Sequence, residues 1–306
     1  MAKELRRHNQ LRFIKELKQH KELYIMLLPF TILFFLFVIL PVLSSAVLSF
    51  TDYNMLQFPK WRGIDNYVRL FLDDDVFLIA FKNTMQFAII TGPISYMMCF
   101  VFAWLINELR PKVRSFVTLV FYAPALTGNV FFIWQFIFSG DTYGLINGNL
   151  LKLGLIHQPI QWLIDPRYNL TIIIIIQLWM SLGTSFLAFI AGLQSVDRTL
   201  YEAGAIDGVR NRWQELWYIT FPSMKPQLLF GAIMQIAASF SVSTISMSLA
   251  GFPSTNYSAH TIVLHMLDFG TIRYEMGYAS AIAVILFIVM LVVKNLIERM
   301  LRYVGN

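Results

Sequence analysis

Uncharged polar side chains recur at helical spacing in two apolar stretches of the chain. In the first stretch they are Gln177, Ser181 and then Thr184 or Ser185. In the second stretch they are Gln235, Ser239, Ser243 and Ser246. Steps of three, four, seven or eight residues return to the same side of a helix, so each set forms a polar stripe on one helix face.

These residue types suit the binding of hydroxyl groups. Amides and hydroxyls both donate and accept hydrogen bonds, so they can replace the water that an uncharged, polyhydroxylated solute loses on entering a pore. The stripes favour a substrate pathway that includes Gln177, Ser181, Gln235 and Ser239. The alternative is that these side chains hydrogen-bond neighbouring transmembrane helices to one another.

The remaining chemistry-bearing residues argue against catalysis and against ion coupling. Up to Lys294 near the end of the last one, the six apolar stretches defined below contain no Asp, Glu, His or Lys. Proton- and ion-coupled carriers need such groups at membrane depth. The five histidines form no His-Glu-x-x-His motif, and the single cysteine, Cys99, excludes a multi-cysteine metal site. We therefore expect no catalytic residue, no metal and no cofactor bound by this chain.

Membrane-spanning helices are the elements that would position the polar stripes. Of the 306 residues, 57% are hydrophobic and 14% charged, a composition that would leave large apolar patches on a water-soluble protein. Six stretches are long enough for a helix to cross about 30 Å of hydrocarbon. They are residues 23–50, 83–107, 115–139, 169–194, 226–250 and 276–297. The predicted fold is an all-α polytopic membrane protein with six transmembrane helices.

Basic residues are distributed unequally between the two sets of connecting segments. Segment 1–22, the loops 110–114 and 195–225 and the chain end from Lys294 hold 17 Lys and Arg, and the other connections hold seven. Because basic residues are enriched on the cytoplasmic side, both termini are predicted to be cytoplasmic. The domains are then a basic N-terminal segment (1–22), a membrane domain (23–297) and a tail (298–306). The net charge of +6 follows from this topology, so no nucleic-acid partner is expected.

The longest predicted cytoplasmic connection, 195–225, has the pattern of a helix-turn-helix. Asp197 or Thr199 can cap a first helix over 200–206, and Gly208 allows a sharp reversal. Asn211 and Gln214 resemble a capping box for a second helix that continues to about residue 219, before two prolines. We expect this elbow to be held together by apolar side chains, namely Leu200, Ala203, Ile206, Leu216 and Ile219. Glu202 and Arg210 would remain available to a partner.

At these residues the sequence resembles the membrane subunits of binding-protein-dependent ATP-binding-cassette (ABC) importers. Their loop motif reads Glu-Ala-Ala, three residues, Gly, nine residues, Ile, one residue, Leu-Pro. The residues that match are Glu202, Ala203, Gly208, Ile219 and Pro222. Three features differ: Gly204 replaces the second Ala, Phe221 replaces Leu, and ten residues separate Gly208 from Ile219.

Further segments resemble the sugar-permease branch of that family, the maltose-type first subunits. They are 63–67 (Gly-Ile-Asp-Asn-Tyr), Asn83-Thr84, 121–125 (Phe-Tyr-Ala-Pro-Ala), 206–208 (Ile-Asp-Gly) and Trp213-Gln214. The resemblance implies a type I ABC importer permease fold in a bacterial or archaeal plasma membrane. It also implies that Glu202, Ala203, Gly204, Asp207 and Gly208 form the helix that couples this chain to an ATPase.

The same resemblance implies several partners for the chain. They are a second homologous permease, two ABC ATPase subunits or a homodimer of one, an extracellular solute-binding protein and a saccharide substrate. ATP and Mg²⁺ would be bound by the ATPase subunits. The alternative function is a self-contained carrier or channel for a neutral polar solute, with the elbow as a regulatory loop. A third interpretation is a membrane scaffold that transports nothing.

Overall fold

Helices form nearly all of the regular structure in the computed structural model, which describes residues 20–128 and 130–303. The first elements are α2 (Lys21–Phe34), η1 (Phe35–Ile39), α3 (Leu40–Leu48), β1 (Thr51–Asp52), β2 (Lys60–Trp61), α4 (Asp65–Leu72), α5 (Asp75–Asn107), α6 (Pro111–Leu126), α7 (Phe131–Ile137), α8 (Leu145–Lys152), α9 (Asn169–Met180) and α10 (Thr184–Ser195). The remainder are α11 (Arg198–Ile206), α12 (Arg212–Glu215), η2 (Leu216–Thr220), α13 (Phe221–Ser223), α14 (Lys225–Phe240), α15 (Thr244–Ala250), η3 (Thr255–Tyr257), α16 (Ile262–Leu267), η4 (Asp268–Ile272) and α17 (Met276–Tyr303). In the described part of the chain, the only strands are the antiparallel pair β1 and β2, so the predicted all-α class is confirmed.

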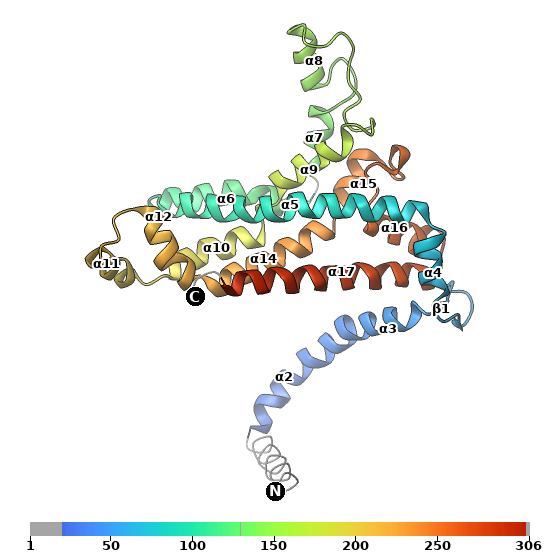
Figure 1. Ribbon diagram of the computed structural model, residues 1–306, viewed down its shortest axis with the longest axis horizontal. Helices are drawn as coiled ribbons and strands as arrows, with labels where there is room; N and C mark the ends of the chain where they lie inside the picture. Colours follow the sequence, from blue (N-terminus) through green and yellow to red (C-terminus); the bar gives the residue numbers. More distant parts are fainter. Residues whose placement is uncertain (1–19, 129, 304–306) are drawn as a thin grey trace.

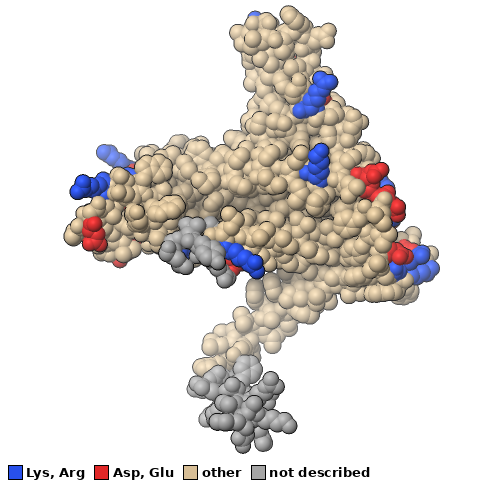
Figure 2. Space-filling view, viewed as in Figure 1, with Lys and Arg blue, Asp and Glu red and all other residues tan. Residues whose placement is uncertain are grey.

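Four long helical elements pack together to form the body of the molecule. Helix α5 contacts α10 and α14, and α14 also contacts α17. In Figure 1 these helices run along the long axis, with α11 and α12 at one end and α4 and β1 at the other. We call the first the elbow end and the second the opposite end. On the face shown in Figure 2, most of the surface of the body is uncharged, and charged side chains are most frequent near its two ends.

Five helical elements in the described residues are long and apolar enough to cross a membrane, and the bent pair α6 and α7 would make a sixth. The pair lies where a single span is predicted at 115–139, but its two helices are bent by 83°. Pro124 lies in the last turn of α6, and Thr127 has an extended backbone, which ends the helix there. The composition of this segment indicates its apolar character, but not its bend.

Two of the predicted spans are interrupted within their apolar stretch. The span at 169–194 consists of α9 and α10, separated by 181–183, and the span at 226–250 consists of α14 and α15, separated by 241–243. A break in a helix frees backbone carbonyl groups, which must find other donors when they lie at membrane depth. Two of these carbonyls do so, because Gln235 donates to the carbonyl oxygen of Ser181 and Thr261 donates to that of Val242.

Two segments diverge from the helical body. The continuous helix formed by α2, η1 and α3 has no buried residue in its apolar window, and only its α3 part lies against α17. In Figure 1 this helix swings away from the body on one side, while α7 and α8 project on the other. Predicted segment 1–22 and tail 298–306 fall largely or partly outside the residues that the structure describes.

The core consists of three apolar clusters along the body. One lies toward the elbow end and includes Phe186, Phe189 and Met224, with Leu216 from the elbow itself. A second cluster joins α5, α16 and α17, and a third joins α7, α9 and α15. Because Leu216 belongs to the first cluster, the elbow is packed against the bundle.

Candidate functional site: the elbow and the cavity beneath it

The elbow consists of α11, α12, η2 and α13, and its helix starts follow the predicted capping chemistry. Asp197 caps α11 by accepting from the backbone N–H of Thr199 at 3.0 Å. Asn211 caps α12 by accepting from the backbone N–H of Gln214 at 2.9 Å. The predicted capping box differs in one contact, because the Gln214 side chain accepts from the N–H of Arg210 instead of that of Asn211.

Two glycines shape the reversal between the helices. Gly208 has φ = +95°, a conformation that makes the predicted sharp reversal, and a Cβ there would meet nothing within 4 Å. The requirement at Gly208 is therefore one of backbone conformation. Gly204 is buried on α11, and a Cβ there would lie 2.6 Å from Cδ1 of Ile219. At Gly204 the requirement is space.

The packing predicted for the elbow is only partly correct. Leu216 is buried and Ile219 packs on Gly204, as the sequence predicts. Leu200, Ala203 and Ile206 are instead exposed, Ile206 at 87%. The small residue Gly204 lets the backbones approach, so the longer apolar side chains of α11 point away from the contact.

The predicted coupling residues form two groups in the structure. Gly204 is the buried one. The exposed residues are Glu202, Ala203, Asp207 and Gly208. Exposed apolar and acidic side chains side by side, including Ile206, are typical of a surface that another protein covers.

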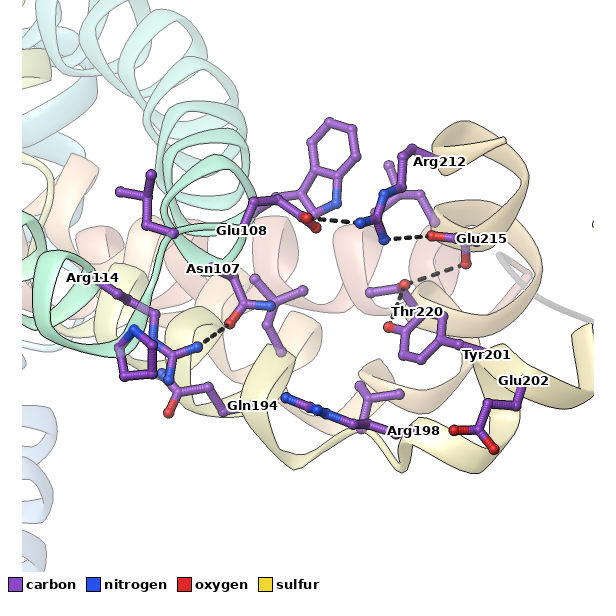
Figure 3. A pocket seen from close by; sticks show the side chains of 16 residues that line it. Asn107, Glu108, Arg114, Gln194, Arg198, Tyr201, Glu202, Arg212, Glu215 and Thr220 are labelled. Atoms are coloured by element: carbon purple, nitrogen blue, oxygen red, sulfur yellow. Dashed lines mark hydrogen bonds and ion pairs between the residues drawn. The ribbon is translucent and has the colours of Figure 1, made fainter. Parts of the chain in front are cut away.

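A cavity of about 600 Å³ lies beneath the elbow (Figure 3). Its lining includes the C-terminal end of α5, the start of α6, the end of α10 and the two helices of the elbow. Among the charged lining residues are Glu108, Arg114, Arg198, Glu202, Arg212 and Glu215. Arg114 donates to Oδ1 of Asn107 at 3.3 Å, which joins the start of α6 to the end of α5.

Arg212 lies between two carboxylates at one edge of this cavity. Its Nη2 is 2.8 Å from Oε2 of Glu108, and its Nη1 is 2.8 Å from Oε2 of Glu215. The hydrogen bond to Glu215 and the charge of Glu108 raise the pKa of the Arg212 guanidinium. We call the ion pair between Arg212 and Glu108 the bridge. Beside it, the ring centroids of Trp104 and Trp213 lie 5.4 Å apart. This contact could not be predicted from the sequence, because Glu108 and Arg212 are 104 residues apart and belong to different loops.

The predicted pathway residues lie in two different environments. Gln177 is half-buried on α9, and Ser181 is half-buried at the start of the break that follows α9. Gln235 and Ser239 are each 5% exposed, inside the bundle. All four remain predicted pathway residues.

Of the two buried residues, Gln235 makes the contacts of interhelical hydrogen bonding and Ser239 does not. Gln235 Nε2 donates to the carbonyl oxygen of Ser181 at 3.3 Å and to Sγ of Cys99 at 3.1 Å, while the Ser239 hydroxyl donates to its own helix. Gln235 and Ser239 also line a largely apolar cavity of about 450 Å³ between α5, α14 and α17.

A second polar cluster, which no local sequence pattern indicates, lies at the opposite end. Asp74 caps α5 and accepts from Tyr278 at 2.6 Å, and its Oδ2 is 2.9 Å from Nε2 of His265. Nδ1 of His265 in turn is 3.3 Å from Nε2 of His260. Burial alone would raise the pKa of Asp74, but the hydrogen bonds from His265, Tyr278 and the N–H of Phe77 hold that pKa well below its usual range.

This cluster is suited to holding elements together and not to binding a metal. It connects the start of α5, helix α16 and the start of α17 through one carboxylate. Within residues 20–128 and 130–303, no group of three or more His, Cys, Asp and Glu side chains is placed to hold a metal ion.

Comparison with known proteins shows the family to which the chain belongs. Residues 107–303 match the family model described as "Binding-protein-dependent transport system inner membrane component", so the chain belongs to this family. The chain is 31% identical over 272 residues to the probable ABC transporter permease protein YesP of Bacillus subtilis, covering 87% of this chain and 85% of YesP. It is 34% identical over 200 residues to the lactose transport system permease protein LacF of Rhizobium radiobacter, covering 64% and 65% of the two chains.

A solved structure supports the same assignment over nearly the whole chain. A crystal structure of a bacterial ABC transporter involved in the import of the acidic polysaccharide alginate contains a chain with 26% identity and a TM-score of 0.77. The match covers 96% of this chain and 100% of that one. The expected ABC importer permease fold is thereby confirmed.

Proposed function

We propose that this chain is a permease subunit of an ATP-driven importer for a sugar or oligosaccharide delivered by an extracellular solute-binding protein. The observation that carries the proposal is the elbow, which exposes Glu202, Ala203 and Asp207 at one end of a chain that belongs to this family. The name of LacF specifies lactose and that of the solved transporter alginate, which supports a saccharide substrate.

An uncharged saccharide fits the composition of the helices that would line its path. The segments 83–107, 169–194 and 226–250 contain no Asp, Glu, Lys, Arg or His, whereas an acidic polymer needs basic side chains to neutralise it. We propose that Gln177 and Ser181 bind substrate hydroxyls on the half-buried side of the interrupted fourth span. Gln235 would then support that span from within the bundle through its bond to Ser181, and both Gln235 and Ser239 would reach the path only when the helices move apart.

A second homologous permease is the partner that would cover the exposed transmembrane surfaces. The apolar window of the α2–α3 helix is 0% buried, and its hydrophobic side chains face away from this chain's own core. In a lone subunit only lipid would cover this helix. In a pair of permeases, the helix would pack against the helical bundle of the second permease.

We propose that the elbow end is cytoplasmic and binds two ABC ATPase subunits, either two different chains or a homodimer. ATP and Mg²⁺ would be bound there, so this chain would have neither a catalytic site nor a cofactor of its own. Closure of the ATPase pair would move the elbow and, through it, the helices as rigid bodies, so that the pathway opens alternately to each side. The assembly would lie in the plasma membrane of a bacterium or an archaeon.

Reconstitution distinguishes this proposal from a self-contained carrier. The complete complex in proteoliposomes should take up radiolabelled saccharide only with ATP and with loaded binding protein. The permease pair without the ATPase should transport nothing. Uptake by this chain alone, at a rate independent of ATP, would show instead a self-contained carrier or channel.

A further inference from the structure

The elbow is connected covalently to two helices of the bundle, and Arg212 connects it to a third. Along the chain, α11 follows α10, and α13 precedes α14. Helix α5 has no covalent link to the elbow, because the next element along the chain is α6. Its C-terminal end, marked by Asn107 and Glu108, lies across the cavity from the elbow in Figure 3. Leu216 and Phe221 of the elbow pack against the apolar side of α5, where the rings of Phe221 and Phe100 are in contact. At the polar end of α5 two further contacts join it to the elbow, the ion pair between Arg212 and Glu108 and the ring contact between Trp104 and Trp213.

A continuous series of polar contacts leads from the first elbow helix to this bridge. The Thr220 hydroxyl donates to the carbonyl oxygen of Glu215 at 3.2 Å, so the Tyr201 hydroxyl, 2.9 Å away, donates to Thr220. The Glu215 carboxylate then binds Arg212, which binds Glu108. Figure 3 shows these contacts as one line from α11 to the end of α5.

Stability alone is a poor explanation for this arrangement. The side chains of Arg212 and Glu108 are 61% and 45% exposed, and exposed ion pairs contribute about 0–1 kcal/mol to folding. The geometry is nevertheless specific, because one planar guanidinium presents separate N–H groups to carboxylates on two different elements. A contact of this kind constrains relative position more than it stabilises the fold.

Helix α5 is well placed to carry a movement across the molecule. Its 33 residues correspond to about 50 Å at ~1.5 Å per residue. The bridge holds its C-terminal end, and Asp74, with partners His265 and Tyr278, holds its N-terminal end. A displacement of α5 at the elbow end therefore reaches the contacts that join α5 to α16 and α17 at the opposite end.

We propose that Arg212 is a positioning residue that makes α5 move together with the elbow when the ATPase closes. This inference rests on the proposed function and adds a route for the movement. Without the bridge, closure still displaces α10 and α14, but the C-terminal end of α5 is joined to the elbow by apolar and ring contacts alone and lags behind. ATP is then hydrolysed without a full opening of the pathway, so the number of saccharides imported per ATP falls.

The test measures uptake and ATP hydrolysis in the same proteoliposomes containing the complete complex. For Arg212→Gln we expect about a 5-fold lower ratio of uptake to hydrolysis, which corresponds to loss of about 1 kcal/mol at the upper limit for an exposed pair. Glu108→Gln, on the other helix, should show the same loss, and the double variant should be no worse than either single variant. Lys112→Gln removes a positive charge from the start of α6 and serves as the matched control.

The outcomes separate this inference from the function on which it rests. If the wild-type complex shows no ATP-dependent uptake, the proposed function fails and the inference with it. If the wild type transports and both single variants keep its ratio, the inference alone is overturned. A proportional fall in uptake and hydrolysis, with fewer assembled complexes, would show that Arg212 acts only in assembly and would also overturn it.

Discussion

Gly204 and Ile219 are in direct contact across the two halves of the elbow. A Cβ on Gly204 would lie 2.6 Å from Cδ1 of Ile219, closer than carbon atoms of this kind approach. Glycine at the position of the motif's second Ala therefore matches the isoleucine opposite it. This contact sets how closely α11 approaches η2, and hence how the exposed face of α11 is presented.

Enlarging Gly204 should separate the two halves of the elbow. Gly204→Ala should have a small effect, because the flexible end of the Ile219 side chain can move away. Gly204→Val should cost about 1–3 kcal/mol by overpacking and reduce binding of the ATPase. Ile219→Ala should partly restore binding in the Gly204→Val variant, measured by co-purification and by Tm. A double variant with no recovery would show that Ile219 does not limit the space.

Backbone conformation, and not space, should determine which residues are tolerated at Gly208. At φ = +95° an added Cβ is strained although nothing lies within 4 Å of it. Gly208→Ala should therefore reduce uptake, and Gly208→Val should reduce it more, since a strained backbone conformation costs about 1–3 kcal/mol and branching at Cβ adds to it. Gly208→Asn should be the mildest change, because Asn tolerates positive φ better. Equal uptake by all three variants would show a flexible loop with no such requirement.

Gln177 and Gln235 should respond differently to replacement by Leu. Gln235→Leu removes the amide bonded to the Ser181 carbonyl, so the complex should lose about 1–3 kcal/mol of stability and its Tm should fall. Gln177→Leu should leave Tm unchanged and reduce saccharide uptake about 5- to 150-fold, because a substrate hydroxyl loses its partner at a dehydrated site. Ala238→Leu, on the exposed side of α14, serves as a volume control. If Gln177→Leu lowers Tm and affects two different sugars alike, Gln177 is a structural residue.

Acid should destabilise the cluster at the end opposite the elbow. Burial, and then the neighbouring His265, lower the pKa of His260 from 6.5 to about 4. As pH falls through this interval, the unfolded chain binds a proton at His260 that the folded chain does not. The free energy of unfolding should therefore decrease between about pH 6.5 and 4, and be unaffected by this group above that range.

Melting curves of the wild type and of His260→Gln over this pH range test the assignment. The variant should have a lower Tm near neutral pH, because the contact to His265 is altered, but a shallower decrease on acidification. The groups facing His260 that also contribute charge are Asp74, His265, Asp268 and Arg273. Identical pH slopes in the two proteins would assign the acid sensitivity to those neighbours.

The sequence predicts those features of the fold and elbow that depend on local pattern. Apolar length locates the spans, and the caps at Asp197 and Asn211 and the turn at Gly208 follow from short-range chemistry. The interruptions of spans four and five could not be predicted in this way. Neither of the two breaks, 181–183 and 241–243, contains a proline. Backbone carbonyl groups at the breaks accept hydrogen bonds from side chains that are distant in sequence, such as Gln235. Helical spacing could not predict that Gln235 would face inward, because that depends on which neighbours surround α14.

The bridge between Glu108 and Arg212 shows the same limit for the functional site. Each is an ordinary charged residue in a basic loop, and nothing in the local pattern distinguishes Arg212 from Arg210 or Glu108 from Glu215. Their contact arises only because the elbow folds back on the end of α5. Long-range geometry of this kind requires the structure.

The most direct measurement of the central claim is a photo-crosslink from the exposed face of α11. Replacing Ile206, which is 87% exposed, with benzoylphenylalanine places a reactive group on the elbow in the assembled complex. The same replacement of Phe58, which is 93% exposed near the opposite end, is the control. We predict that the group at position 206 crosslinks to the ATPase and that the group at position 58 does not. Crosslinking of the ATPase from position 58 and not from position 206 would contradict the proposal that the elbow is where the ATPase acts.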